Sequence, residues 1–404
     1  MSSTTEPTAG PTAERAAGPG AGQAVLAGVV TAVVGFTSSF AVLLTGLTAV
    51  GASPVEAASG LLVCCLTMGL GCVLFSWRTR TPVTLAWSTP GAALLAGAVA
   101  PDGGYASAVG AFVVAGLLYV LTGLFSPLAR LVRAIPLALA NAMLAGVLLV
   151  LCVAPFRALV EEPWAVGPVL LTWLVLLRVA RRWAVPGAFA AAVVVIVVTG
   201  SLSALEATDV VPRMSWTTPG FDTATVLAIG VPLYLVTMTS QNIPGAAVLA
   251  SFGYDAPLRP ALLYSGVATT ATAGLGGYSI NLAAISAALA AGPGAHPDPA
   301  RRWVAGVSTG ATYLAIGPLA AAVAAVAVAA PAGLVAAVAG VALLGTFGSA
   351  AASALAEESQ REAAALTFVV AASGVAVAGV GAAFWSLLAG GLHLLVMSHR
   401  RPSP

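Results

Sequence analysis

Long apolar runs, separated by short segments rich in charge, proline or glycine, fill the chain from residue 22 to residue 397. A helix needs about 20 apolar residues to cross a hydrocarbon core of about 30 Å, and most of the runs meet that length. A polar stretch, 203–222, divides the runs into two equal sets. The pattern predicts fourteen membrane segments, at residues 24–50, 54–77, 82–100, 104–125, 136–155, 163–179, 184–202, 224–250, 258–275, 276–291, 303–329, 331–348, 362–379 and 380–397.

The placement of arginine supports this count, because cytoplasmic loops of membrane proteins carry the excess of basic residues. All 16 basic residues are arginines, and a cytoplasmic N-terminus leaves only Arg157 and Arg213 outside. Without a crossing at 82–100, most arginines between residues 130 and 182 would be exported. We therefore expect both termini to lie in the cytoplasm.

Two of the segments cannot be ordinary helices. Ser88-Thr89-Pro90-Gly91 interrupts segment 82–100, where Thr81–Trp87 is expected to be extended and Ala92–Ala100 helical. Segment 276–291 has a similar pattern, with Gly276–Ile280 extended and a half-helix from Asn281 to Ala291. Seven segments per half would make the two halves run in opposite directions, as in the inverted repeats of many secondary carriers.

Non-helical backbone at membrane depth must face protein or a water-filled cavity, so both breaks are expected to point inward. A half-helix that begins there presents free N–H groups and the positive end of its dipole, which favour an anion. The predicted anion contacts are Ser88, Thr89 and Gly91 on one side and Ser279 and Asn281 on the other. The alternative is that Ser88-Thr89-Pro90 is simply a good helix start.

Polar residues also lie midway along the first segment of each half. Ser38 and Ser39 are weak signals, because hydroxyls in membrane helices often bond only to the preceding turn. Gln241 and Asn242 are stronger, since two adjacent amides at mid-depth are costly unless they line a site, and the pair Pro244-Gly245 that follows is expected to break the helix. Four aromatic residues nearby could hold a flat ring, although ordinary packing is the simpler explanation for each: Phe36, Phe40, Trp87 and Tyr278.

Composition agrees with a chain dissolved in lipid. Of 404 residues, 59% are hydrophobic and 7% charged, and the mean hydropathy is +0.99. The net charge of +2 gives no reason to expect nucleic acid as a partner. Residues 1–21 are predicted to be a disordered cytoplasmic tail and 398–404 a second, shorter tail.

Several function classes are disfavoured. The chain has no nucleophile triad, metal-ligand pattern or phosphate-binding glycine loop, so no enzyme activity, cofactor or metal is expected. Glu56 belongs to a capping box, Ser53-Pro54-Val55-Glu56, and is assigned to structure. Apart from Glu56 at the start of segment 54–77 and the acids that flank segment 362–379, no Asp or Glu lies inside a segment, so the usual carboxylate proton relay is missing.

At this point two stretches resemble a known family. Pro82–Ala93 and Ser240–Gly245 are similar to the signature stretches of the benzoate membrane transport family, which are benzoate:proton symporters. Further agreement at Gly253-Tyr254, His296-Pro297-Asp298, Arg301-Arg302 and Ala365–Phe368 extends the resemblance over residues 22–397. The family looks related in fold to the uracil permease and anion exchanger group.

The resemblance implies an all-α fold with short strands in the third and tenth segments, divided into a core domain and a gate domain. It places the core at residues 22–125 and 224–329 and the gate at 126–202 and 330–397. It also implies motion of the core against the gate, often in a homodimer. The uracil permeases have Glu where this chain has Gln241, and another Glu where it has Ile280, departures that suit an anionic substrate and leave the proton site open.

The sequence thus predicts a carrier in the inner membrane of a bacterium that imports benzoate or a related aromatic carboxylate with protons. The alternatives are a carrier for another small anion or a nucleobase, an anion channel on the same scaffold, and a membrane sensor without flux. The predicted substrate contacts are Ser38, Ser39, Phe40, Ser88, Thr89, Gly91, Gln241, Asn242, Gly245, Tyr278, Ser279 and Asn281.

Overall fold

The computed structural model describes residues 21–125, 127–128, 130, 135–201, 210–377 and 380–398. Residues 1–20 and 399–404, nearly all of the two predicted tails, lie outside it, as do residues 126 and 202–209, where predicted domain boundaries fall. The helices of the first half are α1 (Ala21–Thr37), α2 (Phe40–Ala49), α3 (Pro54–Thr79), α4 (Thr89–Ala96), α5 (Gly104–Leu124), α7 (Leu137–Glu161), α8 (Pro163–Val179) and α9 (Ala184–Val198). Those of the second half are α10 (Thr223–Thr225), α11 (Val231–Thr237), α12 (Ile243–Ser251), α13 (Leu258–Thr272), α14 (Ile285–Ala291), α15 (Trp303–Ile316), α16 (Ala320–Ala329), α17 (Leu334–Leu355), α18 (Arg361–Ala372) and α19 (Ala382–Ser398).

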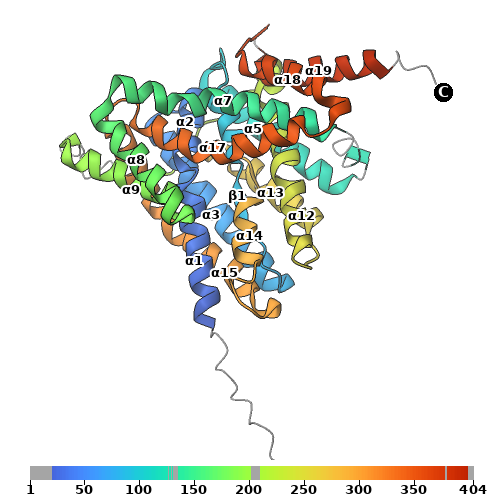
Figure 1. The fold of residues 1–404 in the computed structure, drawn as a ribbon. Coiled ribbons are helices and arrows are strands. Elements are labelled where there is room, and N and C mark those ends of the chain that lie inside the picture. The colour runs from blue at the N-terminus through green and yellow to red at the C-terminus, as the bar shows by residue number, and fades with distance from the viewer. Residues whose placement is uncertain are drawn as a thin grey trace, which may run out of the picture.

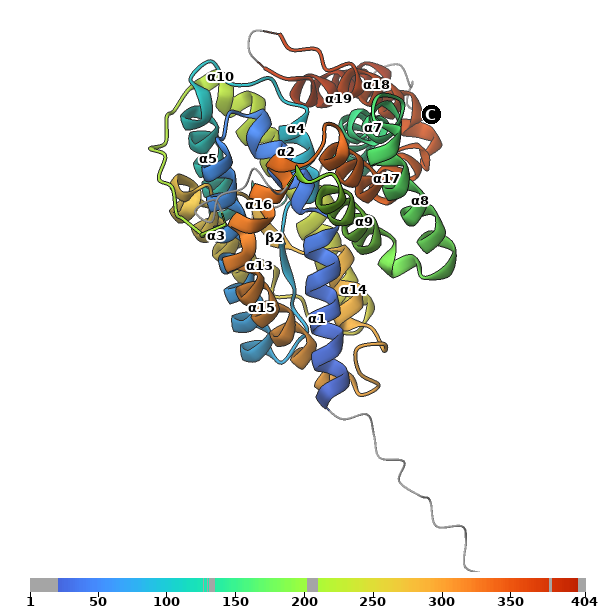
Figure 2. The same ribbon diagram turned by 90° about the vertical axis from the view of Figure 1, so that its left-hand side faces the viewer.

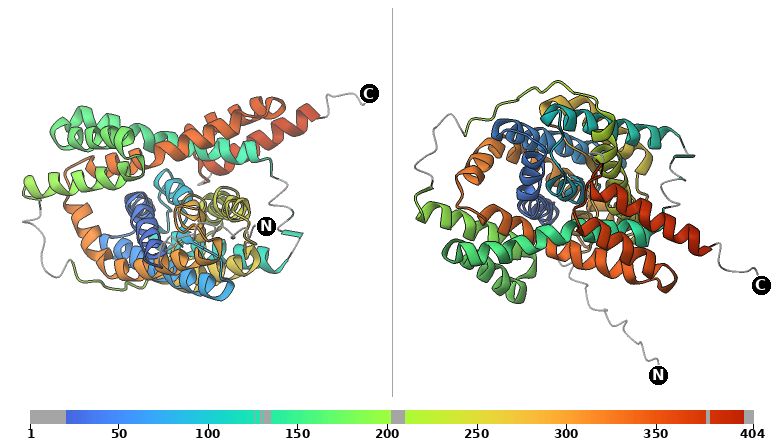
Figure 3. Two further views of the ribbon diagram at one scale, coloured as in Figure 1. Left: turned by 60° about the horizontal axis from the view of Figure 1, so that its bottom comes forward. Right: turned by 90° about the horizontal axis from the view of Figure 1, so that it is seen from above.

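The helices form two bodies that each draw on both halves of the chain (Figures 1 and 3). One body is a bundle in which α5 packs on α13 and α3 packs on α15. The other is an elongated layer in which α7 packs on α17 and α18, and α8 packs on α9. We call these bodies the bundle and the layer.

Eight helical stretches among the described residues are long and apolar enough to cross a membrane. They are Gly22–Ala49, Pro54–Thr79, Gly104–Leu124, Leu137–Glu161, Arg181–Val198, Thr223–Ser251, Pro299–Ala329 and Leu334–Leu355, and two shorter apolar helices are Pro163–Val179 and Ala382–Met397. Large apolar side chains such as Trp164 (91% exposed) face outward from the layer, which suits contact with lipid.

The two interrupted segments meet inside the bundle, where β2 packs against α13 and α3 (Figure 2). Strand β1 (Leu85–Trp87) and strand β2 (Ile280–Leu282) form an antiparallel pair in which Ala86 lies opposite Asn281. Each strand supplies the hydrogen bonds that the other would lack in lipid. Beside the pair, the Ser88 N–H donates to the carbonyl of Ser279 over 2.9 Å.

The second half-helix begins later than predicted. Asn281 lies inside β2, and α14 begins only at Ile285. The side chain of Asn281 turns back to donate to the carbonyl of Leu282 over 2.8 Å. The predicted start at Asn281 was wrong because Asn before an apolar run is typical of a helix start, whereas pairing with β1 holds this residue in extended backbone.

The Pro244-Gly245 pair does not break its helix, which corrects a second prediction. The helix widens instead into two π turns, Val226–Gly230 and Met238–Asn242, and continues as α12. A π turn shifts the hydrogen-bond register of the helix. The helix can therefore continue through Pro244, although proline has no backbone N–H to donate. The first predicted segment, by contrast, does break: α1 ends at Thr37 and α2 begins at Phe40.

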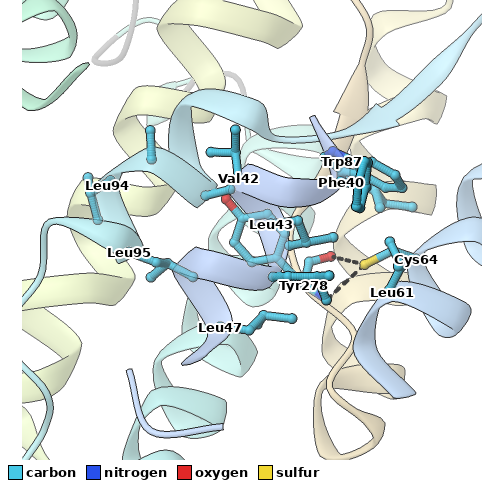
Figure 4. Packing of buried hydrophobic residues seen from close by; sticks show 14 of the residues in the cluster. Phe40, Val42, Leu43, Leu47, Leu61, Cys64, Trp87, Leu94, Leu95 and Tyr278 are labelled. Atoms are coloured by element: carbon cyan, nitrogen blue, oxygen red, sulfur yellow. Dashed lines mark hydrogen bonds between the residues drawn. The ribbon is translucent and has the colours of Figure 1, made fainter. Parts of the chain in front are cut away.

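Local contacts fix the remaining geometry. The predicted capping box at the start of α3 is confirmed, with Ser53 and Glu56 each bonded to the other's backbone N–H. Tyr278 packs among leucines of α2 and α4 with its backbone against Cys64 (Figure 4). Its hydroxyl donates to the carbonyl of Ser88 over 2.8 Å, so the aromatic ring ties the tenth predicted segment to the third.

Candidate functional site

A cavity of about 630 Å³ lies between the bundle and the layer. Its size falls within the range of about 300–1,000 Å³ that is usual for small-molecule sites. The bundle contributes residues from the α1–α2 break, the start of α4 and the π turn before α12, and the layer contributes residues from α7 and α17. A smaller hollow of about 70 Å³ adjoins it, shares Ser38, Ser39, Thr89 and Gln241, and reaches Trp87.

On the bundle side, the predicted residues Ser38, Ser39, Thr89 and Gln241 line both hollows. Ser38 and Ser39 both donate to the carbonyl of Gly35, over 3.0 and 2.9 Å. Ser39 also accepts from the indole N–H of Trp87 over 2.9 Å, which ties the α1–α2 break to β1. The structure therefore brings together residues of the first, third and eighth predicted segments.

Gln241 stands where these elements meet. Its Oε1 accepts from the backbone N–H of Ala284, just before α14, over 3.4 Å. Among the described residues its Nε2 donates to nothing, and the side chain, 8% exposed, lines the cavity. A neutral amide oriented in this way offers an N–H donor without charge, which suits a carboxylate acceptor.

Thr89 is the first residue of α4, and its half-buried side chain also lines the cavity. Ser88, one residue earlier, does not line it. The Ser88 hydroxyl caps α4 by accepting from the N–H of Gly91 and bonds Thr237 over 2.6 Å. The hydroxyl of Ser88 therefore acts as a helix cap, which was the alternative interpretation of Ser88-Thr89-Pro90. Thr89, in contrast, lines the cavity.

Other predicted residues lie behind the cavity wall. Asn242 is fully buried and accepts from the backbone N–H of Leu282 over 3.0 Å, so it fastens the eighth segment to β2. Ser279 bonds the hydroxyl of Tyr119 over 2.6 Å. The predicted residues that lie behind the wall and do not line the cavity are Ser88, Gly91, Asn242, Gly245, Tyr278, Ser279 and Asn281.

The two predicted glycines are required by packing. A Cβ at Gly91 would meet the hydroxyl of Tyr278 and the side chain of Leu233, and a Cβ at Gly245 would meet the carbonyl of Ala283. Neither glycine lies at the cavity surface. Side chains approach the backbone closely at Gly91, and the backbone of Ala283 does so at Gly245, which explains both glycines.

The aromatic residues stack on one another. Phe36 lies parallel to Phe40, with ring centroids 5.4 Å apart, and edge-on to Trp87 at 5.7 Å. Phe40 in turn meets Phe189 of α9 at 4.8 Å and lines a separate apolar hollow of about 280 Å³. Of the four predicted aromatics, only Trp87 borders the hollows that hold Gln241.

The layer side of the cavity was missed by the sequence prediction. A face of α17 carries small and hydroxyl residues at helical spacing, Ala342, Gly345, Thr346, Ser349, Ala350 and Ser353, and all of them line the cavity. Asn141 of α7 and Arg181, in the turn between α8 and α9, complete that wall. The spacing on α17 was a usable signal, but hydroxyl residues in membrane helices are too common to single it out.

Charge in the cavity has one sign. Among the described lining residues, Arg181 is the only charged group and no Asp or Glu is present.

At the far side of α14, Arg302 donates to the carbonyl of Ala291 over 2.9 Å and to that of His296 over 2.7 Å. A cation at a helix C-terminus is favourable, so Arg302 stabilises the short helix whose start abuts Gln241.

The comparisons agree on the kind of protein. Residues 20–396 match a family model described as "Benzoate membrane transport protein". Inner membrane protein YdcO of Escherichia coli (strain K12) is 37% identical over 378 residues, which cover 92% of this chain and 95% of that protein. A benzoate membrane transport protein of Acinetobacter baylyi is 29% identical over 325 residues, covering 80% of this chain and 82% of the relative.

Solved structures show the same fold at low identity. The transmembrane domain of the cyanobacterial bicarbonate transporter BicA superposes with a TM-score of 0.58 at 15% identity, covering 91% of this chain and 97% of that domain. The murine Solute Carrier 26 family member A9 anion transporter, in the inward-facing state, gives a TM-score of 0.63 at 12% identity, covering 94% of this chain and 68% of the other.

The resemblance found in the sequence is thus confirmed, and the protein is a membrane transporter and not an enzyme. The match of nearly the whole chain, with the 37% identity to one relative, shows that this protein belongs to the benzoate membrane transport protein family.

Proposed function

We propose that the protein imports benzoate or a closely related aromatic carboxylate by alternating access, coupled to protons. The observation that carries this proposal is the cavity between the bundle and the layer, with the free amide N–H of Gln241 at its buried end and no acidic residue in its described lining. A carboxylate in a low-dielectric site would be repelled by a fixed negative charge and attracted by such donors. Trp87 offers an aromatic edge beside the same donors.

In this proposal the bundle acts as the core domain and the layer acts as the gate domain. The lining of the cavity passes from buried residues, Ser39 and Gln241, to exposed ones, Ser349, Ser353 and Arg181. Cytoplasmic placement of Arg181 then makes this an inward-open state. Rotation of the bundle against the layer would close this mouth and open the opposite side, which is how carriers alternate around a central site.

Contacts between helices support a seven-plus-seven inverted repeat. In a repeat of seven, the fourth segment corresponds to the eleventh and the ninth to the second. The packing of α5 on α13 then has its counterpart in the packing of α3 on α15. In such a repeat the β1–β2 pair and the α7–α17 pair would join corresponding segments and lie on the symmetry axis.

Proton coupling is the finer part of the proposal. Since the described lining has no carboxylate, the substrate's own carboxyl group, whose pKa lies near that of a Glu side chain, is proposed to help carry the proton. The placement follows the sequence prediction: inner membrane of a bacterium, with both termini in the cytoplasm. Assembly as a homodimer stays a prediction, which the mass of the purified protein in detergent tests.

The deciding experiment is uptake of labelled benzoate into proteoliposomes with and without an inward proton gradient. We expect saturable uptake that the gradient accelerates, with competition by aromatic carboxylates and little by sulfate or uracil. Uptake indifferent to the gradient at every pH would exclude proton coupling. Large single-channel currents would favour the anion channel instead.

A further inference from the structure

Arg181 has a position that the central site does not explain. It lies in the single turn Arg181–Trp183 between α8 and α9, is exposed, and lines the cavity. Among the described residues no ion pair or hydrogen bond occupies its guanidinium. An arginine that only marks the cytoplasmic side of the membrane has no need to border the cavity, as the neighbouring Arg182 shows by being exposed without lining it.

Polar side chains share the cavity lining with Arg181. Ser349 and Ser353 of α17 and Asn141 of α7 line the same wall. None of these side chains carries negative charge, so the field of the guanidinium is not cancelled within the described lining. Low-dielectric walls on either side focus such a field and raise the local concentration of anions.

We propose that Arg181 and the hydroxyl face of α17 form a second carboxylate site at the mouth of the cavity. The site is in series with the central one at Gln241, and it takes the anionic form of the transported acid. The planar fork of arginine matches both oxygens of a carboxylate, whereas the hydroxyls donate one bond each. An anion held there is recruited before it reaches the buried end, or held as it leaves.

This inference rests on the proposed function for its substrate, and two experiments separate the two claims. The first requires no transport. Ser353→Cys is reacted with an anionic sulfonate thiol reagent and with a cationic ammonium one of similar size, in the full chain. The native cysteines, Cys64, Cys65, Cys72 and Cys152, are buried and give little background.

Adding Arg181→Gln should lower the ratio of anionic to cationic labelling rates by about two- to five-fold at low salt, the size expected for one exposed charge. Arg182→Gln is the matched control, because it removes the same charge from the same turn, and it should change the ratio by much less. Equal effects of the two variants would refute a site at Arg181.

The second experiment uses sealed vesicles of defined sidedness. With benzoate supplied from the cytoplasmic side, Arg181→Gln should raise the apparent KM about two- to five-fold with little change in maximal rate, and Arg181→Lys should restore part of the loss. From the other side the KM should be unchanged. A KM shift that is equal from both sides would overturn the proposal, while labelling that responds to Arg181 in a protein that does not carry benzoate would refute only the proposed function.

Discussion

At the residue scale, Gln241 carries more of the proposal than any other side chain. Its Oε1 accepts from the N–H of Ala284 over 3.4 Å, its Nε2 has no partner among the described residues, and the side chain lines the cavity. Fixing the amide in advance lowers the entropy cost of binding a carboxylate. The same bond makes Gln241 a connection between the eighth and tenth predicted segments.

Two substitutions separate these roles. Gln241→Ala removes the donor and should reduce benzoate uptake by about ten-fold or more, as loss of a hydrogen bond to a charged group implies. Gln241→Glu keeps the length of the side chain but adds negative charge to a lining without acids, so uptake should fall at least as far. Initial rates in proteoliposomes give both values.

The control for these variants is Gln360→Ala, in the short turn Glu358–Gln360 outside the cavity lining, where the half-buried side chain bonds only Glu357 among the described residues. It should transport normally. Melting temperatures within a few degrees of wild type for Gln241→Ala would show that it remains folded. Normal uptake by Gln241→Ala would remove this residue from the site.

At the scale of elements, the start of α4 depends on Ser88. Its hydroxyl caps Gly91 and bonds Thr237, while its carbonyl accepts from Tyr278 and its N–H donates to Ser279. Backbone bonds hold the residue in place whatever its side chain. The hydroxyl therefore contributes stability and helix position, apart from any contact with substrate.

Ser88→Ala should lower the free energy of unfolding by about 1–2 kcal/mol, the usual cost of losing a helix cap and a buried hydroxyl bond. Ser373→Ala, at the exposed end of α18, is the control and should cost much less. Unfolding in detergent followed by circular dichroism measures the difference. A stable Ser88→Ala protein that binds benzoate poorly would instead place the hydroxyl in the binding site.

These elements differ in how well the sequence alone predicts them. The break at Ser88–Gly91 was predictable because Pro90 and Gly91 interrupt an apolar run that arginine placement requires to cross. The start of α14 was not, since the strand pairing that extends Asn281 joins residues almost two hundred positions apart. The cavity face of α17 was also hidden, because which side of a helix meets a partner depends on packing between domains.

For the molecule as a whole, the proposed alternating access requires the bundle and the layer to move relative to each other. The exposed serines of α17 at the mouth should then be reachable from only one side of the membrane at a time. The native cysteines are buried, so they should add little background signal to thiol labelling.

Ser349→Cys should react with a membrane-impermeant thiol reagent from the cytoplasmic side, and benzoate should slow that reaction if the ligand fills or closes the cavity. Ser359→Cys, in the exposed turn before α18, is the control and should react equally with or without benzoate. Mass spectrometry gives the labelled fraction. Labelling of Ser349→Cys from the periplasmic side alone would reverse the assigned orientation.

The pairing of β1 with β2 also bears on biosynthesis. While the ribosome is still making the second half, the backbone groups of Leu85–Trp87 have no partner strand, and bare N–H and C=O groups are costly in hydrocarbon. A chain truncated before Ile280 would keep that defect permanently. An unfinished copy is therefore expected to differ from a complete one by unpaired backbone groups at a three-residue strand inside the membrane.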